Sequence, residues 1–198
     1  MIYRKLIKPT FDRVIALLLI AMLLPFWIAG IAIVRLAQGA PIFYLQRRTG
    51  LGLKGFTMYK IRTLESSAQA SLSTENRRYA RFGRFLRNTG LDELPQLLNV
   101  LRGEMSIIGP RPMPVEYESS YSKTQKRRFA CKPGMTGWAQ VHGRNAVSWD
   151  DRFSMDNWYI DHCSFWLDIK IIGRTIKQLL VDKNNEIKMP VFTSTNQT

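Results

Sequence analysis

One long apolar run dominates the pattern of hydrophobic and polar positions. Residues 14–34, VIALLLIAMLLPFWIAGIAIV, contain 21 positions without a charged side chain. As a straight helix this run would extend for about 32 Å, roughly the hydrocarbon thickness of a bilayer. It is longer than the apolar region of a signal peptide, and no small-residue cleavage site follows it. The run therefore predicts a helix inserted in a membrane.

The position of Pro25, in the middle of this run, predicts a kink, because proline lacks an N–H and clashes with the preceding turn. Basic residues flank the run on both sides, whereas the positive-inside tendency would concentrate them on one side. The flanking residues are Arg4, Lys5, Lys8 and Arg13 before the run and Arg35, Arg47 and Arg48 after it. Two interpretations stay open at this point: an ordinary spanning helix with a proline kink, or a segment with both ends in the cytoplasm.

The pattern after the membrane run predicts a small β-hairpin over residues 41–64. Gly50, Gly52 and Gly55 match a GxGxxG motif. A dinucleotide site requires a helix to begin at such glycines, and here a strand-like segment, residues 56–64, follows them. We therefore expect a hairpin without a dinucleotide, followed by a polar loop over residues 65–75.

Helical periodicity dominates the rest of the chain. Residues 76–88 place an arginine at every third position with aromatic residues between, which is typical of an amphipathic interfacial helix or of a solvated basic face. A second helix is expected after a capping box of Thr89 and Asp92, with a leucine stripe and an end at Gly103. Further helices are expected from a Ser148 cap onward and over residues 168–181. The expected fold class is α+β and mainly helical, with amphipathic interfacial helices, a small β-hairpin and a loop-rich active site.

The composition narrows the classes of partner. A chain of 198 residues suits one catalytic domain with an appended membrane element. Its formal charge of +14 favours an anionic partner, which could be nucleic acid, an anionic lipid surface or a phosphorylated substrate. Cys131 and Cys163 are far apart and outside any CxxC spacing, so they indicate neither a disulfide framework nor a zinc site.

Adjacent carboxylates at a predicted helix start are the candidate reactive groups. Asp92 and Glu93 would lie where the helix dipole and free N–H groups favour the ionised form, and an ionised aspartate is a usable nucleophile. The alternative is that Asp92 only caps the helix. Arg87 lies one turn upstream, Arg111 lies between two prolines, and Lys60 ends a predicted strand. Because guanidinium groups bind phosphate oxygens in a bidentate manner, the two arginines suit a diphosphate.

Three segments of the chain carry a specific resemblance to a known family. Residues 58–64 (MYKIRTL), 84–112 (RFLRNTGLDELPQLLNVLRGEMSIIGPRP) and 132–145 (KPGMTGWAQVHGRN) resemble the small monotopic phosphoglycosyl transferases, the bacterial sugar transferase family. The likeness covers nearly the whole chain. It implies that Asp92 attacks the sugar-linked phosphorus of a UDP-sugar and releases UMP, leaving a covalent phosphosugar that polyprenyl phosphate then accepts.

The resemblance also implies roles for the surrounding residues. Glu93 would act as a base toward polyprenyl phosphate, and Mg²⁺ near Asp92 would neutralise the diphosphate. Lys60, Arg87 and Arg111 match positions suited to phosphate binding, and Arg144 would contact the nucleotide or the sugar. Asp168 also matches a family position, with a structural salt bridge as the alternative.

For the membrane segment, the resemblance implies a re-entrant helix-break-helix over residues 1–40 with both ends cytoplasmic. Residues 41–198 would then form a catalytic domain on the interface of the bacterial inner membrane, at its cytoplasmic face. Leu24 departs from the serine that commonly precedes the family's proline, so a carbonyl freed at the bend needs another partner. Anionic lipids are expected partners, nucleic acid is not, and a homodimer stays open.

Two rival functions fit parts of the pattern. The charge and the interleaved arginine and aromatic residues also fit a membrane-anchored nucleic-acid-binding protein, although no recognition module is visible. A non-enzymatic membrane scaffold is the second rival. Release of UMP from a UDP-sugar distinguishes the enzyme from both.

Overall fold

The computed structural model describes residues 2–63, 74–142 and 147–181 of the chain. The α-helices are α1 (Lys8–Gln38), α2 (Thr74–Thr89), α3 (Gln96–Arg102), α4 (Lys123–Lys126), α5 (Trp138–His142), α6 (Trp149–His162) and α7 (Phe165–Val181). The strands are β1 (Phe43–Thr49), β2 (Gly55–Ile61), β3 (Ser106–Ile108), β4 (Met113–Pro114) and β5 (Gly134–Thr136). A π-helical turn, Tyr3–Ile7, leads into α1. The fold is therefore mainly helical with small sheets, as the sequence predicts.

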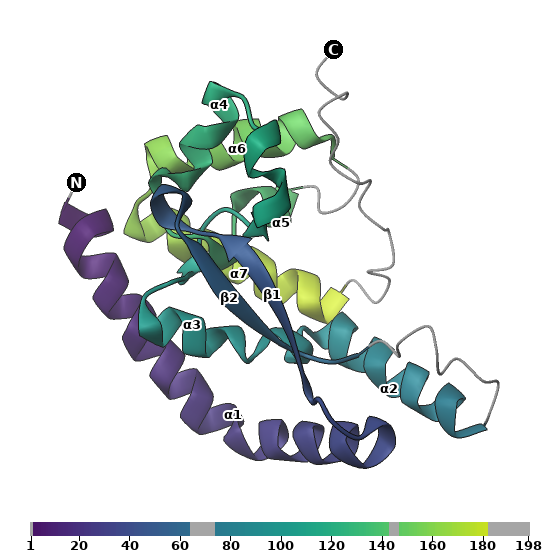
Figure 1. The fold of residues 1–198 in the computed structure, drawn as a ribbon. Coiled ribbons are helices and arrows are strands. Elements are labelled where there is room, and N and C mark those ends of the chain that lie inside the picture. The colour runs from purple at the N-terminus through teal and green to yellow at the C-terminus, as the bar shows by residue number, and fades with distance from the viewer. Residues whose placement is uncertain (1, 64–73, 143–146, 182–198) are drawn as a thin grey trace.

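Helix α1 runs along one edge of the molecule and is long and apolar enough to cross a membrane (Figure 1). It continues through Pro25 as one helix, and Figure 1 shows it changing direction near its middle. Proline is the usual cause of such a kink. The sequence prediction of a kink is thus confirmed as a bend within a continuous helix.

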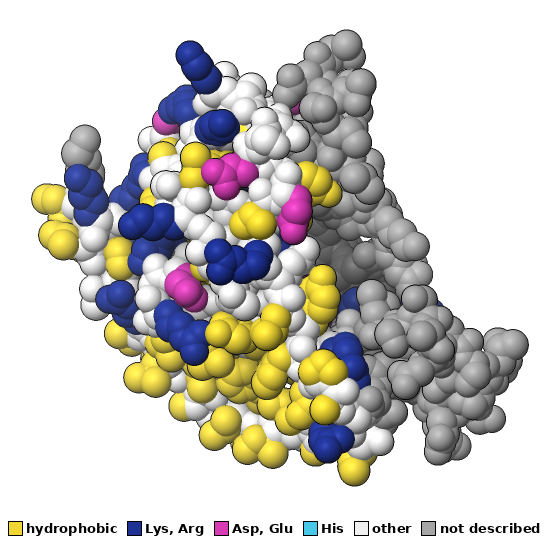
Figure 2. All heavy atoms as spheres, viewed as in Figure 1, with side chains coloured by type: hydrophobic (Ala, Val, Ile, Leu, Met, Phe, Trp, Pro, Cys, Tyr) yellow, Lys and Arg dark blue, Asp and Glu magenta, His cyan; other side chains and the backbone are white. Residues whose placement is uncertain are grey.

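Large apolar side chains cover the outer face of α1 and are exposed. They include Leu17, Leu18, Met22, Phe26 and Ile28, each more than half exposed. Figure 2 shows hydrophobic side chains gathered over the region of α1. An exposed apolar surface of this extent marks a membrane or protein contact, and the length of the helix favours a membrane.

The inner face of α1 belongs to the core of the protein. Ala16 is fully buried in the largest hydrophobic cluster, and Val34 is fully buried in another together with Ile61 and Leu86. Helix α1 packs against α3 and extends to β3. The predicted membrane segment is therefore attached to the rest of the chain near Ala16 and near Val34, while most of its apolar side chains stay exposed.

The predicted hairpin is confirmed, and its strands β1 and β2 pair in antiparallel register from Phe43 opposite Ile61 to Thr49 opposite Gly55. A short 3₁₀ turn, Leu51–Leu53, connects them, and β2 follows it. Gly52 in this turn has φ of 61°, a conformation that glycine adopts without steric cost. Strand β2 follows these glycines, which confirms the predicted hairpin, whereas a dinucleotide fingerprint would have an α-helix at this place.

Two long-range strand pairings were not predicted. Strand β4 pairs with β1, which places the turn before Met113 beside the hairpin. Strand β3 pairs in parallel with β5, and the sequence analysis expected no strand in either segment. These strands have two or three residues, too few to produce a period-2 pattern.

The connection between α2 and α3 corrects the predicted capping box. Thr89 donates its hydroxyl to the carbonyls of Phe85 and Leu86, so it belongs to the end of α2. Gly90 adopts the left-handed conformation, with φ of 71°, and a 3₁₀ turn, Leu91–Glu93, follows. Helix α3 begins only at Gln96 and ends at Gly103. The capping-box prediction was wrong because the chain turns at Gly90 before the new helix starts.

The predictions for the last two helices are largely confirmed. Ser148 accepts a hydrogen bond from the backbone N–H of Asp151 at the start of α6, as expected of an N-cap. Helix α7 begins at Phe165, three residues before the predicted start. The loop predicted over 65–75 lies outside the described residues except for Thr74 and Glu75, which begin α2.

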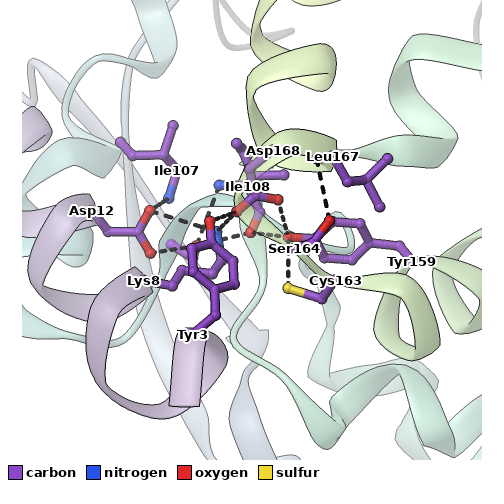
Figure 3. A network of polar contacts seen from close by, with 11 residues as sticks. Tyr3, Lys8, Asp12, Ile107, Ile108, Tyr159, Cys163, Ser164, Leu167 and Asp168 are labelled. Atoms are coloured by element: carbon purple, nitrogen blue, oxygen red, sulfur yellow. Dashed lines mark hydrogen bonds and ion pairs between the residues drawn. The ribbon is translucent and has the colours of Figure 1, made fainter. Parts of the chain in front are cut away.

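A buried polar network fastens the base of α1 to α7 (Figure 3). One carboxylate oxygen of Asp168 accepts hydrogen bonds from Lys8 Nζ at 2.7 Å and from Tyr3 Oη at 2.6 Å. The other accepts one from Tyr159 Oη at 2.7 Å. Nearby, Asp12 accepts a hydrogen bond from Ser106 Oγ at 2.6 Å. The network fixes the N-terminal end of α1 against α7 and β3.

Asp168→Asn is expected to destabilise the fold, because it removes the charge that Lys8 neutralises inside the protein. Removal of one partner of a buried ion pair lowers the free energy of unfolding by about 3–5 kcal/mol. For the exposed pair Arg127–Asp161, Asp161→Asn is expected to cost less than about 1 kcal/mol. Thermal unfolding in detergent compares the two variants. A large increase in the KM for a UDP-sugar, with unchanged stability of Asp168→Asn, would instead support the alternative role of Asp168 in substrate binding.

Candidate active site

The adjacent carboxylates of Asp92 and Glu93 meet one lysine. Lys60 Nζ lies 2.9 Å from Asp92 Oδ2 and 3.1 Å from Glu93 Oε1. The Asp92 side chain is only 2% exposed, whereas that of Glu93 is 21% exposed. The structure thus brings together three of the residues that the sequence selected, with Asp92 the most deeply buried.

A buried asparagine explains why Lys60 reaches the carboxylates. Asn99 in α3 donates through Nδ2 to the carbonyl of Thr57 at 2.7 Å, and its Oδ1 accepts from the backbone N–H of Tyr59. These bonds fasten α3 to β2 just before Lys60. Because the turn Leu91–Glu93 leads directly toward α3, this attachment also fixes the distance between the strand and the carboxylates.

Arg111 approaches the same site from the turn between β3 and β4. Its Nη2 donates to Glu93 Oε1 at 3.2 Å. Arg128 Nη2 donates to the carbonyl of Arg111, and Arg48 Nη1 donates to the carbonyl of Pro112. Two further arginines therefore hold the backbone on which Arg111 is carried. Sequence reasoning treated Arg48 only as part of a basic flank, and its place beside the site depends on the unpredicted β1–β4 pairing.

Burial raises the pKa of Asp92 above its ordinary value, and the positive charge of Lys60 offsets this only in part. The expectation that a helix start would favour the ionised form is therefore not met, since α3 begins four residues after Asp92. For Glu93, burial also opposes ionisation, but Arg111 and Lys60 outweigh it and lower the pKa to about 2. The two neighbouring carboxylates are thus driven in opposite directions, a frequent feature of active sites.

Lys60 is held in its charged form by the same contacts. Burial by itself would favour the neutral amine, but the charges of Glu93 and Asp92 prevail and raise the pKa of Lys60. At neutral pH the site therefore contains the ammonium form of Lys60, placed against the Glu93 carboxylate and the buried Asp92 side chain.

Three other residues were selected from the sequence: Arg87 and Asp168 make contacts with other groups, and Arg144 lies outside the described residues. The contact described for Arg87 is with the carbonyl of Thr63, to which its Nη1 donates at 3.0 Å, rather than with either carboxylate. Thr63 lies three residues after Lys60, so Arg87 is attached to the chain leaving the same strand. Asp168 belongs to the separate network at the base of α1. Arg144 lies outside the described residues.

The cluster of Lys60, Asp92, Glu93 and Arg111 is suited to phosphate chemistry. Lys60 and Arg111 can exchange their contacts with the carboxylates for contacts with phosphate oxygens. The buried Asp92 carboxylate can then attack phosphorus. Within the described ranges, no three His, Cys, Asp or Glu side chains gather to form a metal cage. The Asp92–Glu93 pair is nevertheless compatible with Mg²⁺, which commonly binds one or two carboxylates together with substrate phosphates.

This site, beside an apolar helix long enough for a membrane, is characteristic of a membrane-associated enzyme that acts on phosphate groups. Comparison with protein families gives the assignment. The family described as Bacterial sugar transferase matches residues 3–182, and the chain belongs to it.

Similar proteins include the uncharacterized sugar transferase EpsL of Bacillus subtilis (strain 168). The two are 44% identical over 180 residues, which cover 90% of this chain and 89% of that protein. The UDP-glucose:undecaprenyl-phosphate glucose-1-phosphate transferase of Xanthomonas campestris pv. campestris is 38% identical over 87% of this chain, but this match covers only 38% of that longer protein. A transferase of the same name from Caulobacter vibrioides is 37% identical over 89% of this chain and 71% of its own length. These names give no support to the nucleic-acid-binding or scaffold alternatives.

Proposed function

We propose that the protein transfers a phosphosugar from a UDP-sugar to polyprenyl phosphate, with undecaprenyl phosphate as the natural acceptor. The observation that carries this proposal is the buried Asp92 carboxylate, held by Lys60 beside the Glu93–Arg111 pair. The names of the Xanthomonas and Caulobacter relatives support the same class of donor and acceptor. The reaction would be a membrane step that begins a bacterial glycan pathway.

The reaction would proceed in two displacements on phosphorus. In the first, a carboxylate oxygen of Asp92 forms a bond to the sugar-linked phosphorus, and the bond from that phosphorus to the bridging oxygen breaks. UMP leaves with the electron pair, and the phosphosugar stays on Asp92 as an acyl phosphate. In the second, an oxygen of polyprenyl phosphate attacks the same phosphorus. The bond to Asp92 breaks, which yields the polyprenyl diphosphate sugar and restores the carboxylate.

Lys60 and Arg111 would have a specific role in starting this two-step reaction. Because Lys60 contacts Asp92 directly, transfer of the Lys60 ammonium to a diphosphate oxygen would release the nucleophile and neutralise the donor together. Arg111, with a side chain 43% exposed, is the more accessible cation for first contact with the substrate. Arg87 would add a further phosphate contact from the end of α2, and Arg144 one to the nucleotide or the sugar.

Glu93 and Mg²⁺ complete the proposed site. With a pKa of about 2, Glu93 is a weak base while Lys60 and Arg111 remain on it. Its role as a base toward polyprenyl phosphate would therefore begin when a diphosphate draws these cations away and its pKa rises. Asp92 would hold Mg²⁺, which when bound supplies positive charge to the diphosphate.

The test of this function is a panel of UDP-sugars incubated with undecaprenyl phosphate and the purified protein in detergent. At least one donor is expected to yield UMP and a lipid-linked phosphosugar in equal amounts. Release of UDP in place of UMP would indicate an ordinary glycosyl transfer. No turnover with any donor, from protein shown to be folded, would refute the proposal.

We further propose that residues 1–40 form a re-entrant membrane element and that residues 41–198 form a catalytic domain on the cytoplasmic face of the inner membrane. The bend of α1, the basic residues on both flanks and the packing of Val34 against Ile61 support this arrangement. Anionic lipids would be the counterions of the basic residues.

Topology is tested with single cysteines at two exposed positions, Lys5→Cys and Leu45→Cys, in a background with Cys131 and Cys163 replaced by Ser. Both cysteines are expected to react with an impermeant thiol reagent only from the cytoplasmic side. Labelling from opposite sides would establish a spanning helix.

A further inference from the structure

Two cations from distant parts of the chain converge at the C-terminal end of α3, the opposite end of this helix from the carboxylate cluster. Arg13 belongs to α1, and Lys132 lies between the 3₁₀ turn Arg127–Ala130 and β5. Arg13 Nη2 and Lys132 Nζ lie 3.0 Å and 3.4 Å from the point that a Cβ atom on Gly103 would occupy. The two charged groups are therefore close enough for one phosphate group to contact both.

Neither of these cations forms a salt bridge within the part of the chain that the structure describes. The acidic residues nearby have other partners. Asp12 accepts a hydrogen bond from Ser106 Oγ, and Glu104 accepts one from Asn99 Nδ2. Burial and the charge of the neighbouring arginine lower the pKa of Lys132, and Asp12 opposes this effect only in part. An anion between the two cations would relieve their repulsion.

The segment that carries Lys132 is held beside the N-terminal part of α1. Arg4, in the π-helical turn before α1, donates through Nη2 to the carbonyl of Ala130. Ser106 of β3 donates its backbone N–H to the carbonyl of Pro133. Because these contacts lie on both sides of Lys132, its ammonium group is held beside α1 before any ligand binds.

The two cations lie at the edge of the apolar surface of α1. Arg13 is exposed and directly precedes the uncharged run, and Val14 and Leu17 are 51% and 59% exposed. Residues four apart lie on the same face of a helix, so Leu17 lies beside Arg13. Figure 2 shows Lys and Arg side chains along the border of the hydrophobic region over α1. An amphipathic ligand can thus place an anionic group between the cations and a hydrocarbon chain along α1.

From the convergence of Arg13 and Lys132, and from the exposed apolar side chains beside them, we infer that this pair binds the phosphate of an anionic phospholipid. The acyl chains of the lipid lie along α1 next to Leu17. The inference rests on the proposed placement of α1 in the membrane, in which Arg13 lies at the depth of the lipid headgroups. It assigns one headgroup to one pair of residues, and the bound lipid is a partner that holds the N-terminal end of α1 at this depth.

The test is native mass spectrometry of the purified protein in nonionic detergent, with equimolar phosphatidylglycerol and phosphatidylcholine that carry the same acyl chains. The wild-type protein is expected to retain phosphatidylglycerol preferentially. A basic residue at an anionic lipid surface contributes about 1 kcal/mol, equivalent to about 5-fold in binding, so Arg13→Gln and Lys132→Gln should each lower this preference about 5-fold. Lys126→Gln removes one charge from an exposed lysine of α4, apart from α1 (Figure 1). This variant is the matched control and should leave the preference unchanged.

Equal retention of the two lipids by the wild-type protein would refute the lipid site. An undiminished preference in folded Arg13→Gln and Lys132→Gln proteins, or an equal loss in Lys126→Gln, would also refute it. Inorganic phosphate, added as a competitor at constant ionic strength, is expected to leave the preference intact because it has no acyl chain. Loss of the preference at a phosphate concentration equal to that of the lipid would show that the pair binds a free anion. Since the assay requires no turnover, phosphosugar transfer at Asp92 is judged separately by UMP release.

Discussion

Replacement of Asp92 by Asn is expected to abolish the phosphosugar adduct and to lower UMP release on the order of 10⁴-fold or more, as removal of a catalytic nucleophile does. The side chain keeps its size, so the buried site, with Asp92 at 1% exposure, should stay packed. Only the charge and the nucleophilic oxygen are lost. Intact-protein mass spectrometry after incubation with UDP-sugar alone measures the adduct directly.

Asp161→Asn is the matched control for this change. Asp161 is an exposed aspartate paired with Arg127 at 2.7 Å, far along the chain in α6. This variant should form the adduct at the wild-type rate. An adduct of full occupancy on the Asp92→Asn protein would show that another residue is the nucleophile, and peptide mapping would identify it.

Lys60→Met is expected to have the second-largest effect, a loss of about 10²–10³-fold in adduct formation at neutral pH, comparable to removal of one group that stabilises charge in a transition state. Two losses combine in this variant. The diphosphate loses a cation, and Asp92 loses the contact that partly offsets its burial. Without that contact the pKa of Asp92 rises further above its ordinary value.

The pH dependence of Lys60→Met follows from the same argument. Only the carboxylate form of Asp92 is nucleophilic, so adduct formation falls as the pH decreases through the pKa of Asp92. A higher pKa moves this fall to higher pH, and raising the pH should recover part of the lost rate. Lys60→Arg keeps the positive charge. Its rate of adduct formation should therefore fall at low pH (the acid limb of the pH–rate profile) over nearly the same range as that of the wild type. If the acid limb of Lys60→Met coincided with that of the wild type, Lys60 would not control the ionisation of Asp92.

Local patterns in the sequence were sufficient to predict several secondary-structure elements. The uncharged run over residues 14–34 required a long apolar helix, Pro25 required a bend, and the segment after Gly55 had the pattern of a strand. Each of these features depends on the covalent structure of a few neighbouring residues and on the period of their apolar positions. The adjacency of Asp92 and Glu93 is likewise fixed by the chain itself.

The contacts between residues distant in the sequence could not be predicted from these local patterns. Asn99 brings β2 to α3, the β1–β4 pairing places Arg48 beside the Arg111 turn, and Arg87 faces Thr63 rather than a carboxylate. Such contacts depend on which surfaces pack together, which a local period does not encode.

The sequence by itself determined that this chain has an apolar helix long enough to cross a membrane, a hairpin, and an acidic pair with lysine and arginine motifs. Only the tertiary structure decided that Lys60 contacts Asp92 while Arg111 contacts Glu93, and that Asp168 fastens α1 to α7. The physical reason is that the state of a charged group depends on its burial and on charges within a few ångströms. Both are properties of the packed chain, and they give two adjacent carboxylates opposite pKa shifts.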